Sequence, residues 1–377
     1  MSRPPVLWAI LHDLDRSGVP VALARLVRWQ ARVRPDAVEI HILAGRDGPL
    51  RTELASVAAS VTALEPAIGR SRARSTALAL AELGASAAGR QVDERWIRHR
   101  VRRLPRPDVV LVQGAGAWPT FEAVEPSIGQ ARVVAHLHEL DVALSRSVHG
   151  AQAEALLLRP EALLAVGPAV ADLAVRSGAP SGRLTIVPGS VDDPPGGWDA
   201  ALAPGPRSAL VSIGTAGWRK GTDLAIAGAH ELGRTHPAAR WHWVGAPEPS
   251  PWRLAAGSSD PLVRHPATEA PWSAVTDVAA LVVPSREDPL PLVALEAGSR
   301  GVPVVAVRTG DLAALLAADR GLLAAPGDLS GLVAAATACL DQPGAADQRA
   351  LALRRYVRDE HATVVVGPRW LDAVLGA

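Results

Sequence analysis

The sequence predicts an α/β protein built from two doubly wound domains, each with a parallel sheet. Three observations lead to this prediction. The chain has 377 residues, which is too long for one ordinary hydrophobic core. Short apolar runs, partly β-branched, alternate with helical or turn-rich stretches, and a Pro/Gly-dense stretch at 188–206 interrupts this alternation. Near-continuous apolar strands are what a parallel sheet covered on both faces requires.

The first half of the chain carries seven runs that we expect to be strands, with helices or turns between them. They are residues 6–11, 38–44, 61–64, 109–112, 133–137, 163–166 and 184–187. These runs predict a first domain over residues 1–190, followed by a linker at 191–206.

The alternation restarts after the linker and predicts a second domain over residues 207–360. Its expected strands are residues 209–213, 241–244, 262–264, 280–283, 302–307 and 322–324, and its expected helices include 222–234 and 291–299. Gly301 is expected to end the second of these helices. Within residues 361–377 we expect a last helix, near 362–375, that packs back on the first domain. A cleft between the two domains is expected to hold the ligands.

Composition excludes several classes of protein. The chain is 48% apolar and 20% charged, which is typical of a soluble globular protein, and no apolar run reaches the ~18 residues of a membrane helix. The run 6–11 is too short for a signal sequence, so we expect a cytoplasmic protein. Cys339 is the only cysteine, which excludes disulfides and thiolate metal sites within the chain. The net charge of +1 argues against a nucleic-acid partner.

The stretch IGTAGWRKGTDLAIAG at 213–228 indicates an anion site. A buried strand leads into Gly214, and Arg219 and Lys220 come just before a helix. Exposed N–H groups at a helix start, beside a forked guanidinium and a mobile ammonium, favour phosphate. Taken alone, the Arg-Lys-Gly sequence fits a solvated turn equally well.

The stretch PSREDPLPLVALEAG at 284–298 places two acids around a helix start. Pro291 can occupy the first helical position, where its missing N–H costs nothing, and the free amides of Leu292 and Val293 face the crevice. Asp288 and Glu296 are separated by seven residues. Asp288 could approach a sugar and Glu296 a ribose. Alternatively, Glu296 could lie in water and only complement the helix dipole.

These motifs together resemble the retaining glycosyltransferases of the GT-B fold, glycosyltransferase family 4 or glycosyl transferases group 1, which include sucrose synthase and trehalose-phosphate synthase. In that family an acid is followed after seven residues by Glu, with Gly-Phe-Gly after the first acid. Asp288 and Glu296 match the two acids, Pro289 to Pro291 match Gly-Phe-Gly, and the Arg-Lys-Gly stretch matches the family's phosphate clamp.

Two stretches of the first half also resemble that family. VVAHLHEL at 133–140 is similar to the first-domain strand that ends in His at the acceptor side, and LDRSGVP at 14–20 is similar to the Gly-containing first loop. The resemblance implies a GT-B fold, with two Rossmann-like domains facing across a cleft, and a nucleoside diphosphate sugar as donor.

The resemblance implies a role for each matched residue. Glu296 would bind the ribose, and Arg219 and Lys220 the diphosphate, with Gly214 in the same loop. Asp288 would hold donor-sugar hydroxyls. The prolines remove two amides that Gly-Phe-Gly would offer, which leaves the N–H groups of Leu290, Leu292 and Val293 as donors. None of the matched motifs is an acidic metal cluster, so we expect no metal and no cofactor besides the donor substrate.

His138 is predicted to position the transferred sugar or the acceptor, because it follows a strand and precedes Glu139. A satisfied core histidine is the alternative, and His136, inside the same strand, is the competing candidate. Gly18 would permit close approach of acceptor or phosphate, although glycine is also common at a helix entry.

The segment RWIRHRVRRLPRP, from Arg95 to Pro107, is strongly basic. A solvated arginine-rich helix is the simpler interpretation. The other is peripheral contact of Arg95–Arg106 with an anionic membrane or a phosphate-bearing acceptor.

The sequence thus predicts a retaining glycosyltransferase that moves a sugar from a nucleoside diphosphate to an acceptor hydroxyl on a small molecule, glycan or lipid-linked compound. Neutralising the diphosphate leaving group would be the main source of rate enhancement. A non-catalytic nucleotide-sugar-binding protein, and an epimerase or hydrolase on the same fold, are the alternatives.

Overall fold

A computed structural model of the chain describes residues 3–202, 207–248 and 261–376. Residues 203–206 of the predicted linker, and Ala377, lie outside this range. The chain divides into two compact units: unit 1 comprises Met1–Pro188 and Val366–Ala377, and unit 2 comprises Gly189–Val365. The division falls at the start of the predicted linker, whose described part belongs to unit 2.

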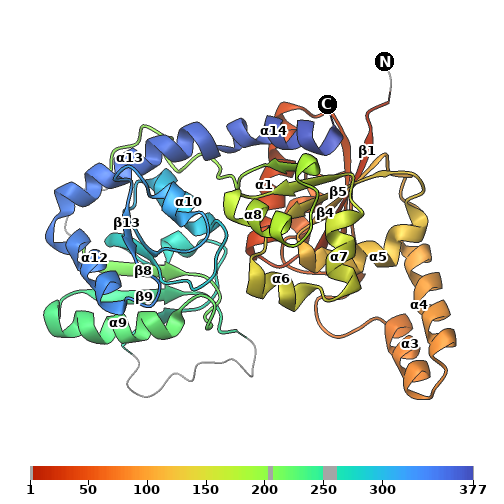
Figure 1. Cartoon of the computed structure of the whole chain (residues 1–377), viewed down its shortest axis with the longest axis horizontal. Helices are drawn as coiled ribbons and strands as arrows, with labels where there is room; N and C mark the ends of the chain where they lie inside the picture. The colour runs from red at the N-terminus through yellow and green to blue at the C-terminus, as the bar shows by residue number, and fades with distance from the viewer. Residues whose placement is uncertain (1–2, 203–206, 249–260, 377) are drawn as a thin grey trace. The chain divides into compact units, whose positions relative to one another are not determined.

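Unit 1 is a parallel seven-stranded sheet in the order β3-β2-β1-β4-β5-β6-β7 (Figure 1). Its strands are β1 (Val6–Asp13), β2 (Glu39–Arg46), β3 (Ser60–Glu65), β4 (Val109–Gln113), β5 (Arg132–Leu137), β6 (Ala162–Ala165) and β7 (Leu184–Ile186). Its helices are α1 (Gly18–Val33), α2 (Arg51–Ala55), α3 (Arg72–Glu82), α4 (Ser86–Val101), α5 (Trp118–Val124), α6 (Asp141–Ser147), α7 (Ala151–Leu158) and α8 (Pro168–Arg176).

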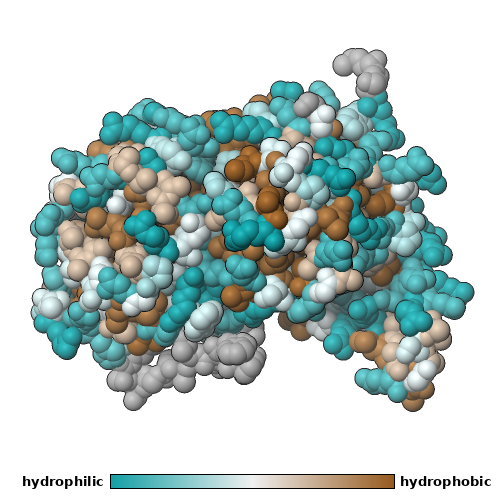
Figure 2. Space-filling model, in the orientation of Figure 1, coloured by the Kyte–Doolittle hydropathy of each residue, from teal (hydrophilic) through white to brown (hydrophobic). Residues whose placement is uncertain are grey.

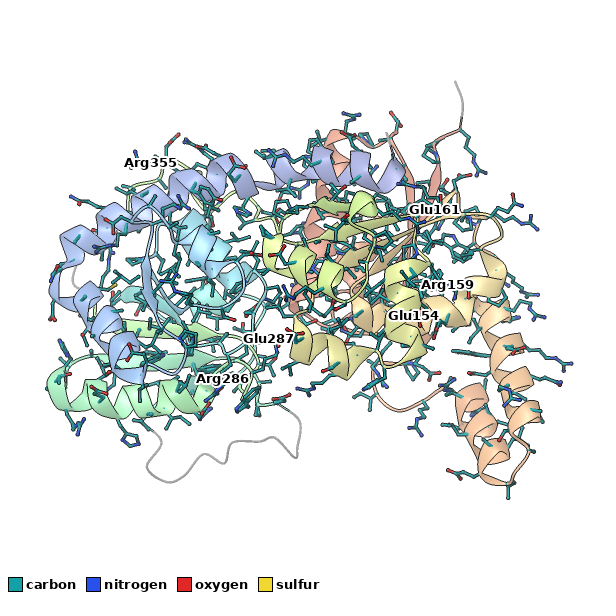
Figure 3. All side chains as sticks on the ribbon, in the orientation of Figure 1. Glu154, Arg159, Glu161, Arg286, Glu287 and Arg355 are labelled. Carbon is teal, nitrogen blue, oxygen red and sulfur yellow. The ribbon has the colours of Figure 1, made fainter. Side chains whose placement is uncertain are left out.

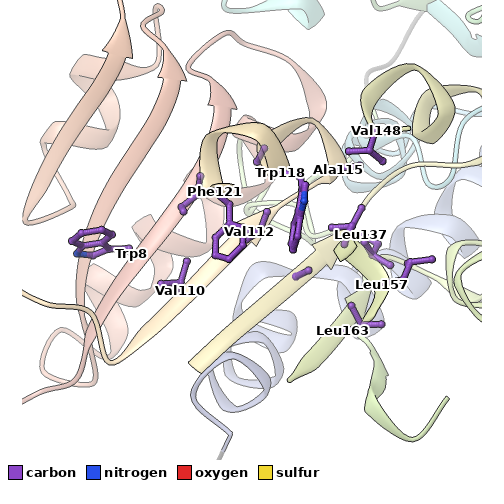
Figure 4. Packing of buried hydrophobic residues seen from close by; sticks show 14 of the residues in the cluster. Trp8, Val110, Val112, Ala115, Trp118, Phe121, Leu137, Val148, Leu157 and Leu163 are labelled. Atoms are coloured by element: carbon purple, nitrogen blue, oxygen red, sulfur yellow. The ribbon is translucent and has the colours of Figure 1, made fainter. Parts of the chain in front are cut away.

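Buried apolar side chains cover both faces of this sheet. One cluster joins the strands to α4, α5, α7 and α8 and includes Trp8, Trp118 and Phe121 (Figure 4). The other joins them to α1 and to α14 (Thr363–Leu375), whose Trp370 is fully buried. Packing on both faces explains why the strands are apolar at nearly every position. The helices α3 and α4 form a pair that extends away from the sheet (Figure 1).

Unit 2 is a parallel six-stranded sheet in the order β10-β9-β8-β11-β12-β13. Its strands are β8 (Ala209–Ile213), β9 (Arg240–Val244), β10 (Val263–His265), β11 (Val278–Val283), β12 (Val304–Val307) and β13 (Leu322–Ala324). Its helices are α9 (Thr222–Thr235), α10 (Leu292–Arg300), α11 (Leu312–Leu315), α12 (Leu329–Asp341) and α13 (Pro343–His361). Two apolar clusters again cover the two faces.

The strand order reverses between β1 and β4 in unit 1 and between β8 and β11 in unit 2. In open α/β sheets ligands bind outside the carboxyl ends of the strands at such a switch point. The predicted loop with Arg219 and Lys220 follows β8, and the predicted loop with Asp288 follows β11. The order of strands therefore brings them to one place in unit 2.

The helix after β11 differs in one detail from the prediction. Pro291 was expected at the first helical position, but it is the residue before the helix, with an extended backbone (φ −63°, ψ 120°), and α10 begins at Leu292. The extended backbone of Pro291 makes it the residue that precedes the helix rather than its first residue. Gly301 ends the helix as predicted, in the left-handed conformation with φ 65°.

Candidate functional site

The loop after β8 packs directly against the loop after β11. Gly221, with φ 71°, lies just before α9, and a Cβ atom there would be 2.0 Å from the carbonyl oxygen of Pro284. No side chain fits in that space. Glycine at 221 is therefore required both by its left-handed backbone and by the approach of the neighbouring loop.

Hydrogen bonds also join the two loops. Arg219 donates from Nη1 to the carbonyl of Glu287 at 2.9 Å, and the amide of Arg286 donates to the carbonyl of Arg219 at 2.9 Å. Lys220 Nζ forms an ion pair with Asp288 Oδ2. Arg219, Lys220 and Asp288, which lie far apart in the sequence, thus meet at the carboxyl ends of β8 and β11.

Asp288 is buried, with 5% of its surface exposed, and the side chain of Lys220 is 21% exposed. Both line a small pocket together with Ser212 and Ser285, with a cavity volume of about 10 Å³. The ion pair therefore compensates a buried carboxylate. Lys220 is also the only lysine in the chain, a signal that could have singled it out from the sequence.

Sequence reasoning missed a second ion pair beside the first. Arg286, labelled with Glu287 in Figure 3, binds both carboxylate oxygens of Asp223 at 2.7 and 2.6 Å. Its guanidinium lies 5.1 Å from the ring centroid of Trp218. The bond to Asp223 raises the pKa of Arg286. Burial acts to raise the pKa of Asp223, but the hydrogen bond and the charge of Arg286, together with backbone hydrogen bonds, outweigh it and the pKa is lowered. This pair fixes the loop that carries Arg219.

Glu296 lies on the second turn of α10, and its carboxylate is held by an aromatic side chain. Trp272 donates from Nε1 to Glu296 Oε2 at 2.8 Å, and the guanidinium of Arg300 lies 5.3 Å from the Trp272 ring centroid. The alternative of a carboxylate lying only in water does not describe this residue. Trp272 is 24 residues away in the sequence, and no local pattern indicated it.

The other predicted residues of unit 2 surround the start of α10. Leu292 and Val293 are its first two residues, whose N–H groups have no partner inside the helix. Leu290 is 8% exposed and its side chain belongs to the apolar core. Gly214 follows β8 with φ 142°, and a Cβ atom there would be 3.7 Å from Cε of Lys220, an ordinary van der Waals contact. Glycine is therefore favoured here by its backbone conformation rather than by lack of space.

In unit 1, His138 follows β5 and belongs to a buried polar network. Gln113 Nε2 lies 3.0 Å from His138 Nε2 and 3.4 Å from His136 Nδ1. His136 Nε2 lies 3.2 Å from the carbonyl oxygen of Val187, which can only accept a hydrogen bond, so Nε2 carries the proton. The amide of Gln113 therefore donates to both rings, and we infer that the proton of His138 is on Nδ1.

Both histidines are neutral over the ordinary pH range. Burial lowers the pKa of His136 to about 4 and that of His138 well below its usual value. His136 is 2% exposed and is held inside the sheet, whereas His138 is half-buried at its edge. A neutral His138 is suited to hydrogen bonding rather than to carrying a positive charge.

The carboxylate of Glu139 organises the loop after β4, a role that the sequence did not indicate. It accepts from the amides of Ala115 and His138, both at 2.9 Å. Gly114 has φ 81°, and a Cβ atom there would be 2.7 Å from Glu139 Oε1. Burial raises the pKa of Glu139 against these hydrogen bonds.

Gly18 is the first residue of α1, at the carboxyl end of β1. A Cβ atom there would meet no atom within 4 Å, so packing does not require glycine. Within residues 3–202, 207–248 and 261–376, no group of three or more His, Cys, Asp or Glu side chains is placed to hold a metal ion. No helix in these ranges is long and apolar enough to cross a membrane.

Residues 207–342, which carry the two loops and α10, match the family described as glycosyl transferases group 1. The chain is also 30% identical over 229 residues to glycogen synthase of Mycobacterium tuberculosis, a match that covers 58% of this chain. The matched region covers 54% of the relative, so the chain spans about half the length of the curated relatives it matches.

Solved structures match nearly the whole chain. HepE of Anabaena, in complex with UDP and glucose, has a TM-score of 0.73 at 14% identity, covering 99% of this chain and 100% of that one. Sucrose-phosphate synthase of Thermosynechococcus elongatus has a TM-score of 0.73 at 16% identity, covering 98% and 97%. WaaG, a glycosyltransferase of lipopolysaccharide biosynthesis, has a TM-score of 0.70 at 15% identity, covering 99% and 100%. These likenesses confirm the predicted GT-B fold.

The contact between the two loops predicts that one methyl group added at residue 221 strongly destabilises the protein. Gly221→Ala should lower the free energy of unfolding by about 2 kcal/mol or more, because the Cβ atom would clash with Pro284 and the backbone is left-handed. Urea unfolding measures the effect. Gly233→Ala, in the same helix with no atom within 4 Å of the added Cβ, is the control and should not destabilise. Equal midpoints for the two variants would contradict the packing argument.

The buried His136 predicts an acid-sensitive contribution to stability. Its pKa of about 4 lies below the unfolded value, so the unfolded chain binds a proton first and stability falls as the pH drops from 6.5 toward 4. Between pH 7 and pH 5 this amounts to roughly 1–2 kcal/mol. His136→Gln should show a smaller loss in urea unfolding at the two pH values, whereas exposed His230→Gln should match the wild type. If His136→Gln lost as much stability as the wild type between pH 7 and pH 5, a contribution of His136 would be excluded.

Proposed function

We propose that the protein is a retaining glycosyltransferase that moves a sugar from a nucleoside diphosphate to an acceptor hydroxyl. The observation that supports it most is the meeting of Arg219, Lys220 and the start of α10 at the β8/β11 switch point, inside the region that matches the family. A helix N-terminus with two cations is suited to the diphosphate.

In this proposal each site residue of unit 2 has one role. Arg219, Lys220 and the amides of Leu292 and Val293 bind the diphosphate and stabilise its charge as the sugar leaves. Glu296 binds the ribose. Asp288, which is paired with Lys220 through Oδ2, would accept bonds from sugar hydroxyls, and the Lys220 ammonium would turn toward the diphosphate.

Unit 1 would supply the acceptor side. His138, neutral and protonated on Nδ1, would donate a hydrogen bond to the sugar or the acceptor, and the open space around Gly18 would admit the ligand. The departing diphosphate would take the acceptor proton, so no general base of the protein is required. The donor would bind without a metal ion.

The first donor to test is UDP-glucose, because the HepE structures contain UDP, glucose and UDP-glucose. The acceptor is identified only by its chemistry, as a hydroxyl on a small molecule, glycan or lipid-linked compound. The products distinguish this proposal from its alternatives, which are a binding protein without turnover and an epimerase or hydrolase.

The single lysine gives a direct test of donor binding. Reductive ¹³C-methylation would label Lys220 and the α-amino group alone, and a bound nucleoside diphosphate should shift the Lys220 signal in an NMR spectrum. Lys220→Ala and Glu296→Ala should each weaken nucleotide binding at least tenfold, whereas Arg234→Ala, on the last turn of α9, should not. Binding that is indifferent to Lys220→Ala and Glu296→Ala would reject the site.

Turnover separates the proposal from its alternatives. Incubation with UDP-glucose and acceptor should yield a glycoside with the donor's anomeric configuration, at the same rate with and without EDTA. Free glucose or an epimer formed at full rate without acceptor would instead identify a hydrolase or epimerase. Binding with no product would favour a non-catalytic protein.

Trp272 predicts a further effect on the ribose site. Trp272→Phe removes the N–H donor to Glu296 and keeps an aromatic ring, so nucleotide affinity should fall about threefold to tenfold while folding is retained. The control is Trp198→Phe, which removes a similar bond to Asp193 at 2.7 Å and should leave affinity unchanged. Calorimetric titration measures both. Equal nucleotide affinities of the wild type and Trp272→Phe would show that Trp272 does not position Glu296.

A further inference from the structure

A basic pocket lies in unit 1 at the amino ends of the strands. It has a volume of about 150 Å³ and is lined by Arg98, Arg102 and Arg106, together with Trp8 and Ser127. Trp8 is near the start of β1, Arg106 precedes β4, and Ser127 precedes β5. Because parallel strands share one direction, this edge of the sheet is opposite to the edge that carries His138.

Packing of the chain holds the pocket in place. The helix α4 ends at Val101, whose side chain, like that of Ile97, is buried in the apolar cluster. Trp8 belongs to the same cluster (Figure 4) and donates from Nε1 to the carbonyl of Pro105 at 3.0 Å. This bond holds the turn between Arg102 and Arg106, and the three arginines border one cavity.

Three of the neighbouring acids are bound to other groups. Asp93 pairs with Arg74 and Glu125 with Arg159. Asp108 accepts from the amide of Val6 at 2.8 Å and lies 3.7 Å from Arg3. Among the described residues, Arg98, Arg102 and Arg106 form no ion pair and no side-chain hydrogen bond. Their charges are therefore available to a ligand, whereas Arg286 in unit 2 is neutralised by Asp223.

We propose that this pocket binds a phosphate group, separately from the site of sugar transfer. Guanidinium groups bind phosphate oxygens in pairs of parallel hydrogen bonds. The volume of about 150 Å³ has room for about five water molecules and is below the ~300 Å³ of typical small-molecule sites. It therefore suits a phosphate, a diphosphate or a lipid headgroup better than a nucleotide. Since the pocket lies at the opposite edge from His138, its ligand is held and does not react.

Two sources could supply this phosphate: a free small molecule or an anionic lipid. The helical pair beside the pocket carries hydrophilic side chains along its length and apolar ones at its tip (Figure 2), and Leu83, in the turn between α3 and α4, is 83% exposed. A membrane surface would accommodate both features. The test therefore has one arm for each source.

The test compares two double variants with the same loss of charge. Arg98→Ser with Arg102→Ser removes two pocket arginines, whereas Arg95→Ser with Arg103→Ser removes two exposed arginines of the same segment that do not line the pocket. One arm titrates inorganic pyrophosphate by calorimetry. The other measures cosedimentation with phosphatidylcholine vesicles, with and without phosphatidylglycerol. Both double variants retain Arg219 and Lys220, so the donor site contributes equally.

The pocket variant should weaken binding at least tenfold in one arm, and the matched variant less than threefold. Loss in the pyrophosphate arm identifies a free phosphate compound, and loss in the phosphatidylglycerol arm identifies a lipid headgroup. Arg106→Ser is a second, independent variant that should weaken binding in the same arm of the test. Equal weakening by the two double variants, or no binding in either arm, would overturn the proposal.

Discussion

The close approach of the loops after β8 and β11 is the constraint on which the candidate site depends. The two strands are neighbours where the strand order of unit 2 reverses, and glycine at 221 lets the carbonyl of Pro284 come into contact with the start of α9. Only at this separation can Arg219 reach the carbonyl of Glu287 and Lys220 reach Asp288. A larger residue at 221 would separate the groups that we propose bind the diphosphate.

The charged groups of this site already have partners in the protein. Lys220 is paired with Asp288, Arg286 with Asp223, and Glu296 accepts from Trp272. A donor must therefore replace protein contacts rather than only add new ones, and the free energy of binding is the difference between the two sets. Arg286 and Trp272 would hold their neighbours in place, while the flexible Lys220 can exchange Asp288 for phosphate. The presence of a single lysine in a chain otherwise supplied with arginine agrees with this need for a mobile charge.

Unit 1 has polar groups at both edges of its sheet, and their electrostatics differ. At the carboxyl edge, burial keeps His136 and His138 neutral, and Glu139 is occupied by backbone amides. At the amino edge, the three pocket arginines remain charged and border a cavity. A neutral edge suits hydrogen bonding to a sugar or an acceptor, and a charged one suits an anion. The two edges can thus bind different ligands without competing.

The sequence alone determined the two doubly wound domains and which loops carry the candidate site, because apolar strands and glycine- and proline-marked loops are local patterns. It also located the end of α10 at Gly301, although not its first residue. Only the tertiary structure decided the partners of the charged groups. Lys220 and Asp288 are 68 residues apart, and Trp272 and Glu296 are 24 apart. Such pairs depend on strand order and on the packing of loops, which no local spacing encodes.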